Sequence, residues 1–142
     1  MKLARWWMRV VGAFYLMEGI GLTLMASLAP NEFAEMWATA APGSLDDIAV
    51  RGTLIAGLPG VLTWVLFGST LWFLSRVPER SRLLIVLVVA WELFIWLPLD
   101  LLGLLNGFSG ERALGLIAFH LVVGVSGIFA LRSLPKEAWA RS

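Results

Sequence analysis

Four long apolar segments limit what this chain can fold into more than any other feature of its sequence. Each segment is long enough for the roughly 20 helical residues that cross a lipid bilayer. The sequence is 59% hydrophobic and 15% charged, whereas soluble domains average about 45–50% and about 25%. We therefore predict one all-α domain, a bundle of four transmembrane helices. These helices are predicted at about residues 8–29, 45–75, 83–105 and 112–132.

The connection between the first two helices is the longest and has a pattern of its own. In "NEFAEMWATAAPGSLDD", the residues Phe33, Met36 and Trp37 fall on one helical face. This spacing predicts a short amphipathic helix that lies on the membrane surface. Ser44 and Asp47 have the spacing of a capping box, so we expect the second helix to begin near residue 45. The sequence leaves open whether this connection is a surface loop or a lid over a cavity.

Basic residues are distributed unequally between the two predicted sides of the membrane. Nine of them precede the first helix, join the second helix to the third, or follow the fourth, and two lie on the opposite side. The nine are Lys2, Arg5, Arg9, Arg76, Arg80, Arg82, Arg132, Lys136 and Arg141, and the two are Arg51 and Arg112. Because cytoplasmic segments carry an excess of Lys and Arg, we expect an integral inner-membrane protein with both termini in the cytoplasm.

Three ionisable residues fall near the centre of the predicted bilayer, each on a different helix. At about 1.5 Å per helical residue, Glu18, Glu92 and His120 lie within about 3 Å of one plane. A charge at this depth costs roughly 2.5–3.5 kcal/mol on insertion scales, so such groups find partners in the interior or become neutral. We expect the three to converge on one site and to act there as catalytic acids and bases.

Asp100 is a fourth candidate for acid–base catalysis. It follows Glu92 on the third helix and is expected about 9 Å outward of the plane of Glu92. Its expected partner is Arg51, near the outer end of the second helix, which we also count as a candidate ligand-binding residue. Arg51 has an alternative partner in Asp47, four residues earlier on the same helix. The sequence does not decide between the two partners.

Aromatic residues accompany these acids. Five of the eight tryptophans lie near helix ends, where belts of interfacial aromatic residues explain them. These five are Trp6, Trp7, Trp37, Trp72 and Trp139. Four aromatic residues nearer to mid-depth are candidates for lining a ligand site, namely Tyr15, Trp64, Trp91 and Trp96.

Small and helix-breaking residues mark the same depth. Pro98 removes a backbone hydrogen bond and should kink the third helix, and broken helices at mid-membrane depth are where sites often form. Gly124 and Gly127 share the helical face of His120 and would let another helix, or a ligand, come close.

Composition excludes several classes of function. The net charge of +1 provides no electrostatic footprint for binding nucleic acid. The chain has no cysteine, which excludes disulfides, thiolate catalysis and cysteine-ligated metals. Glu18, Glu92 and His120 lack a ligand pair three or four residues apart, so we predict no metal site and no cofactor.

Three stretches of the sequence resemble a known family. "RWWMRVVGAFYL", "WELFIWLPLDLL" and "FHLVVGVSGIFAL" are similar to the BphX-like family of small four-helix membrane proteins, which are encoded in some aromatic-degradation gene clusters. That family is similar to the wider DoxX-like group. The matching polar positions are Glu92, Asp100 and His120. The resemblance implies the four-helix fold and a membrane location, and it implies no particular reaction.

Three functions fit these residues. The one that we favour is an acidic and aromatic pocket for a lipophilic small molecule, with acid–base catalysis such as isomerisation, cyclisation or epoxide opening. The second is a structural or accessory subunit whose polar residues only join helices. The third is a homodimeric, proton-coupled exporter of hydrophobic cations, since Glu18 resembles the first-helix glutamate of the small multidrug resistance exporters. The expected partners are the bilayer and the small molecule, and the sequence leaves open whether there is a reaction.

Overall fold

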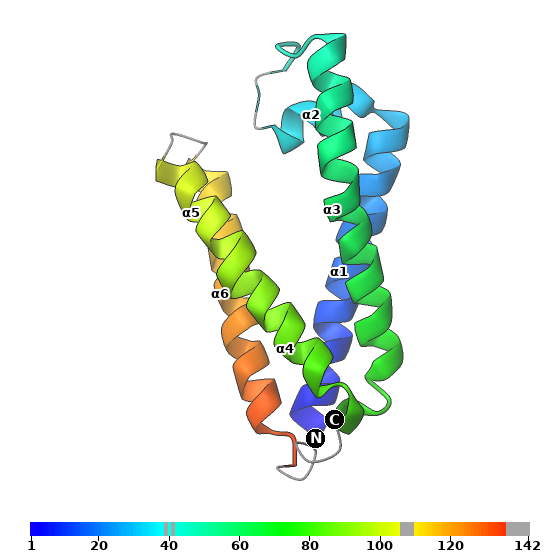
Figure 1. The fold of residues 1–142 in the computed structure, drawn as a ribbon, viewed down its shortest axis with the longest axis vertical. Coiled ribbons are helices and arrows are strands. Elements are labelled where there is room, and N and C mark those ends of the chain that lie inside the picture. The colour runs from blue at the N-terminus through cyan, green and yellow to red at the C-terminus, as the bar shows by residue number, and fades with distance from the viewer. Residues whose placement is uncertain (39, 41, 106–109, 136–142) are drawn as a thin grey trace. The chain divides into compact units, whose positions relative to one another are not determined.

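The protein is built from helices (Figure 1). The computed structural model describes residues 1–38, 40, 42–105 and 110–135, and these residues contain no strand. In chain order the elements are α1 (Lys2–Leu28), α2 (Pro30–Trp37), α3 (Asp47–Leu74), the 3-10 turn η1 (Pro78–Arg80), α4 (Arg82–Ala90), the π-helical turn η2 (Trp91–Trp96), α5 (Leu97–Leu105) and α6 (Gly110–Arg132). The basic residues Lys136 and Arg141 and the interfacial Trp139 of the sequence analysis lie outside the described residues.

Four helical stretches are long and apolar enough to cross a membrane, as predicted. They are Lys2–Leu28, Asp47–Leu74, Arg82–Leu105 and Leu114–Arg132, the third being α4, η2 and α5 joined end to end. The prediction placed the start of the first helix near residue 8, whereas α1 begins at Lys2. Apolar composition predicts only the lipid-facing part of a helix. The backbone hydrogen bonds of α1 also include the basic residues before residue 8.

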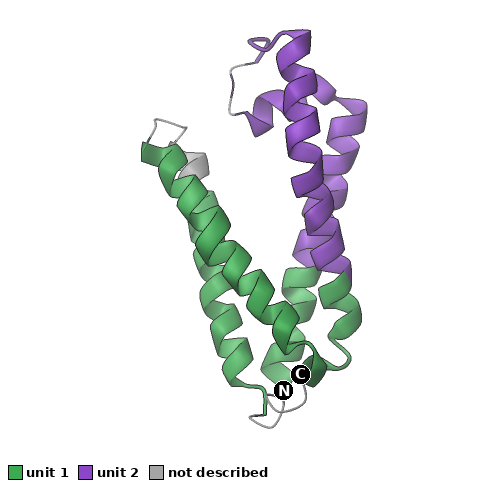
Figure 2. Ribbon diagram, viewed as in Figure 1, with its two compact units in different colours: residues 1–12, 70–142 green, residues 13–69 purple. Residues whose placement is uncertain are grey.

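The chain divides into two compact units, shown in separate colours in Figure 2. Unit 1 comprises residues 1–12 and 70–142, and unit 2 comprises residues 13–69. The first part of α1 and the last turn of α3 therefore belong to unit 1, together with α4, η2, α5 and α6. The remainder of α1 and α3, with α2, forms unit 2.

In unit 2, the short helix α2 packs on α1 and α3 through its apolar face. Phe33 is fully buried in a cluster with Ala26 of α1 and Val61 of α3. Trp37 stacks on Phe33 at a ring-centroid distance of 5.5 Å and also covers Gly57, where an added Cβ would lie 3.1 Å from the indole. The predicted amphipathic helix exists, and its apolar face packs on α1 and α3. Its location at the membrane surface stays a prediction.

The start of α3 differs from the predicted capping box. The side chain of Asp46 accepts a hydrogen bond from the backbone N–H of Ala49 at 2.8 Å, which is the geometry of an N-cap residue. Asp47 is then the first helical residue, two positions later than expected. The run "SLDD" offers two capping residues, and sequence spacing alone selected Ser44 over Asp46.

In unit 1, side chains from distant parts of the chain join the start of α1 to α6. The indole N–H of Trp7 donates to Oγ of Ser126 at 2.9 Å, and Trp7 is only 6% exposed. At the same end, the amino group of Met1 donates to the carbonyl of Ser133 at 2.8 Å. The prediction of an interfacial role is therefore wrong for Trp7, because its partner Ser126 lies more than a hundred residues away and no local pattern reveals it.

Glycines allow α6 to approach α4 and η2 closely. A Cβ added at Gly124 would lie 2.4 Å from Leu93, and one added at Gly127 would lie 2.4 Å from Val89 and 2.9 Å from Trp7. Such distances are too short for real atoms. Of the two possibilities that the sequence left open for these glycines, the structure therefore shows the close approach of another helix.

A matched pair of glycines in α1 tests the helix packing of unit 2. A Cβ at Gly19 would lie 2.7 Å from the Val65 side chain and 3.0 Å from its backbone nitrogen, whereas a Cβ at Gly21 meets nothing within 4 Å. Gly19→Ala should therefore lower the free energy of unfolding by about 1–3 kcal/mol. Gly21→Ala should leave it unchanged or raise it by up to about 1 kcal/mol. Thermal unfolding in detergent measures both, and equal effects would contradict the packing described.

Candidate functional site

The candidate site lies where the third span departs from regular α-helix. In η2 the backbone N–H of Leu97 donates to the carbonyl of Glu92, five residues back instead of four. Pro98 follows directly, and a proline has no N–H to donate and crowds the carbonyl four residues before it. A π-helical turn relieves this crowding, and such turns occur frequently at functional sites. The predicted kink at Pro98 is thus accompanied by a locally widened helix.

The π-helical turn also decides which way the two acids of this span point. In a regular α-helix, residues eight apart differ in direction by about 80°. A π-helical turn accommodates one extra residue, so Glu92 and Asp100 point as residues seven apart would point in a regular α-helix. Seven residues make nearly two full turns, so the two directions differ by about 20°. Both carboxylates therefore lie on the face that packs against α6.

His120 of α6 contacts both of these carboxylates. Its Nδ1 pairs with Oε2 of Glu92, and its Nε2 lies 2.9 Å from Oδ2 of Asp100. Glu92 is 1% exposed, His120 is 3% exposed and Asp100 is 18% exposed. We refer to Glu92, His120 and Asp100 as the triad. All three belong to unit 1, and Asp100 is the member that is most accessible from outside.

The two contacts of His120 favour one number of protons on the triad. Nδ1 has hydrogen-bond geometry toward Glu92, whereas Nε2 is within ion-pair distance of Oδ2 of Asp100, which has no aligned hydrogen bond. Two facing lone pairs repel each other, so each contact is most favourable with one proton between its atoms. An imidazolium ring donates both protons to two carboxylates, or a neutral ring donates one and a carboxylic acid donates the other. In either case the triad holds two protons and a net charge of −1. One further proton would make it neutral.

Aromatic rings surround the imidazole in unit 1. The ring of Trp96 lies parallel to that of His120, with 6.2 Å between centroids and 10° between planes, and Phe119 meets it edge-on at 5.4 Å. Trp91 in turn meets Trp96 edge-on at 6.3 Å. Of the two tryptophans predicted from sequence, Trp96 lies against His120, and Trp91 lies against Trp96. Phe119 was missed, although its position next to His120 in the sequence was an available signal.

The structure gives Asp100 a partner that the sequence did not predict. Asp100 pairs with His120, and Arg51 lies exposed near the start of α3 in unit 2, so its pairing with Asp100 or Asp47 stays a prediction. The sequence estimate placed Asp100 well outside the plane of Glu92 because it used the rise of a regular α-helix along its axis. The π-helical turn aligns the two side chains, and the imidazole ring, which carries a nitrogen on either side, spans the distance that remains.

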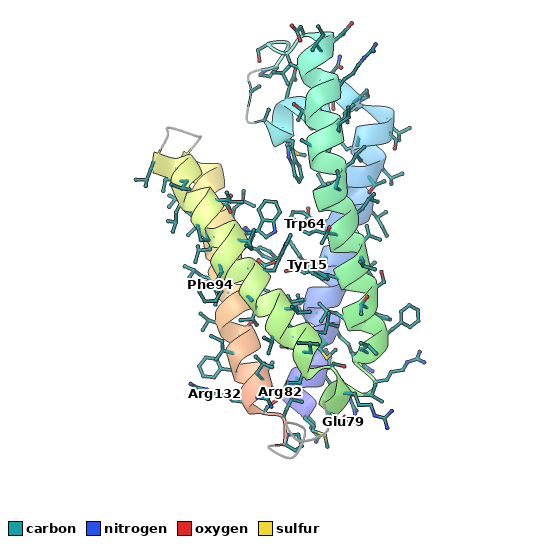
Figure 3. All side chains as sticks on the ribbon, in the orientation of Figure 1. Tyr15, Trp64, Glu79, Arg82, Phe94 and Arg132 are labelled. Atoms are coloured by element: carbon teal, nitrogen blue, oxygen red, sulfur yellow. The ribbon has the colours of Figure 1, made fainter. Side chains whose placement is uncertain are left out.

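The other predicted site residues lie in unit 2. Tyr15 is buried and stacks on Trp64 at a centroid distance of 6.3 Å, with 13° between planes (Figure 3). Glu18, one turn further along α1, is exposed. The role of these three residues, and that of Arg51, at the triad stays a prediction.

The arrangement of the triad suits proton transfer better than metal binding. No group of three or more His, Cys, Asp or Glu side chains in the described part of the chain is arranged to hold a metal ion. Both ring nitrogens of His120 already face carboxylate oxygens, whereas a metal-bound histidine uses one nitrogen for the metal.

No family model, curated protein or solved structure matches this chain. The resemblance to the BphX-like family therefore stays a prediction that depends on three short motifs.

Deleting one residue from η2 tests the account of the π-helical turn. Phe94 is 74% exposed and points outward (Figure 3), so its removal costs little packing. The deletion should convert η2 to regular α-helix, keep Glu92 and Asp100 on one face, and preserve the unfolding temperature within a few degrees.

Deletion of Leu87, which is 50% exposed in α4, is the control. It leaves η2 intact and rotates the preceding part of α4 by about 100°, which turns buried residues such as Ile85 outward. This variant should be strongly destabilised. If both deletions destabilise the protein equally, the extra residue of η2 does not set the direction of the acids.

Proposed function

We propose that this is an integral inner-membrane protein, with both termini in the cytoplasm, that binds a lipophilic small molecule at the triad and exchanges protons with it. The observation that carries the proposal is the contact of one imidazole with two carboxylates of another span. Glu92 and His120 each stand near the middle of a span, where ionisable groups are expensive and serve function by default. Helix packing alone does not need three of them.

Several features support the membrane location. The four apolar spans have large side chains such as Met17, Ile55 and Phe94 more than 70% exposed, which is costly in water and natural in lipid. In unit 1 the bond from Met1 to Ser133 places the start of α1 beside the end of α6. Arg82 and Arg132 lie at this same end (Figure 3), as expected for a cytoplasmic end rich in basic residues.

The triad supplies the groups that general acid–base chemistry needs. In the two-proton state with a neutral ring and a protonated Asp100, Asp100 gives its proton to the lone pair of Nε2 of His120 while the proton on Nδ1 moves to Glu92. The ring stays neutral, one proton has moved from the accessible end to the buried end, and the ionised Asp100 takes up the next proton. Glu92 is then the general acid or base toward the ligand. Isomerisation, cyclisation and epoxide opening are the reaction types that need such a group and no cofactor.

A structural role is the second candidate, and one observation favours it. The triad joins the third span to α6 where Gly124 and Gly127 let the two approach closely, so the polar contacts also hold these helices together. The two functions differ in what happens when the triad is removed as a whole.

The first test measures ligand capture. The protein is purified in lipid nanodiscs from native membranes, and bound small molecules are identified by mass spectrometry after extraction. The wild-type chain should retain a lipophilic molecule that Glu92→Gln loses, because the amide keeps the shape of the side chain but cannot exchange a proton. Glu79→Gln, at the exposed η1 turn, is the matched control and should retain the molecule. Identical extracts from all three proteins would remove the proposal.

A second test separates function from helix packing. His120→Ala leaves two carboxylates facing each other and should cost about 3–5 kcal/mol of stability. Replacing Glu92, His120 and Asp100 together by leucine removes all buried charge. That variant should be at least as stable as the wild type by thermal unfolding, and it should bind no ligand. If it proves as unstable as His120→Ala, the triad serves mainly to hold the helices together.

A further inference from the structure

The apolar middle segments of the four spans contain acidic residues and no permanently basic ones. Residues 10–28, 52–74, 83–105 and 113–131 contain three carboxylic acids and one histidine, and they contain no lysine and no arginine. The acids are Glu18, Glu92 and Asp100. The lysines and arginines within the four spans lie outside these apolar segments, and they are Lys2, Arg5, Arg9, Arg51, Arg82 and Arg132. The protein therefore has no permanent positive charge at the depth where the triad lies.

The triad at this depth carries negative charge in its two-proton state. With one proton in each of the two contacts of His120 the net charge is −1, and Glu92 and His120 are almost completely buried. A net charge in a medium of low dielectric constant is expensive unless an opposite charge accompanies it. Either a third proton or a positively charged ligand can accompany the triad, and both are monovalent.

We infer that the ligand of the triad is a lipophilic monovalent cation, such as a protonated amine with an apolar body, which replaces the third proton. This inference rests on the proposed function, because it assigns a chemical class to the ligand of the same site. Trp96, parallel to the imidazole, and Trp91, edge-on to Trp96, offer indole faces, which attract cations most strongly among the aromatic side chains. Asp100, the partly exposed acid, offers the carboxylate that an arriving cation meets first.

The exchange balances in charge and in protons. The triad with three protons is neutral, and on binding a cation it releases one proton to solvent and becomes the two-proton triad paired with that cation. The groups that take part are Glu92 and Asp100 on the third span and His120 on α6. The other described charged side chains of unit 1 lie outside the apolar segments given above, and they are Lys2, Arg5, Arg9, Arg76, Glu79, Arg80, Arg82 and Arg132. Net charge at mid-depth stays constant, so the apolar interior never holds an uncompensated charge.

Two probes of equal shape and opposite charge test this inference. Tetraphenylphosphonium and tetraphenylborate are titrated calorimetrically into the protein in nanodiscs, with empty nanodiscs subtracted, in two buffers of different protonation enthalpy. The phosphonium should bind one per chain and release up to one proton, which appears as a buffer-dependent heat. The borate should show no protein-dependent binding. Glu92→Gln and Asp100→Asn should each weaken phosphonium binding at least tenfold, and Glu79→Gln should not.

The outcomes separate this inference from the proposed function. If both probes bind equally, or if neither acid substitution weakens phosphonium binding, the cationic class is wrong. If an uncharged lipophile nevertheless co-purifies with the protein in a manner that depends on Glu92, the proposed function stands without this inference. If the binding of neither a cation nor a neutral lipophile depends on Glu92, both the proposed function and this inference are wrong. Where Glu92→Gln fails to fold, Asp100→Asn carries the test, because Asp100 is less buried and its loss costs less packing.

Discussion

The pairing of one imidazole with two carboxylates inside an apolar helical hairpin is the constraint on which the rest of unit 1 depends. Glu92 and His120 are almost inaccessible, so neither can be solvated by water if its partner moves away. The contacts therefore fix the register of α6 against the third span. Gly124 and Gly127 make the close approach possible, and the π-helical turn before Pro98 puts the second acid on the correct face. The two contacts of His120 therefore depend on the glycines and on the π-helical turn together.

Much of the fold follows from the sequence, because spans of this length and composition have few alternatives. Four spans and a short amphipathic helix were predicted and are present. Helix boundaries were less accurate, since apolar composition marks the part of a helix that suits lipid and not its last hydrogen bond. The surroundings of Phe33 and Trp37 were also missed. An apolar face at the membrane surface and an apolar face packed on neighbouring helices have the same periodicity, so only tertiary structure distinguishes them.

The candidate site was predicted in part, and the physical reason is specific. Counting residues along the helices put Glu92 and His120 at one depth, and the structure brings these two together. The same count separated Asp100 from them, because a π-helical turn leaves no mark in hydrophobic periodicity. The partner of Trp7 was invisible for a different reason, since Ser126 lies on another helix far along the chain. The charge of a residue and its depth along a span can thus be predicted from the local sequence. The direction of a side chain that follows a helix irregularity cannot.

The most direct measurement of the central claim uses the fact that His120 is the only histidine in the chain. Protein labelled with ¹⁵N-histidine in lipid bilayers gives solid-state NMR signals from one imidazole alone. The account predicts that both ring nitrogens are hydrogen-bonded, that Glu92→Gln shifts mainly the Nδ1 signal, and that Asp100→Asn shifts mainly the Nε2 signal. Signals of an ordinary neutral imidazole that neither substitution changes would contradict the triad, and with it the proposed site.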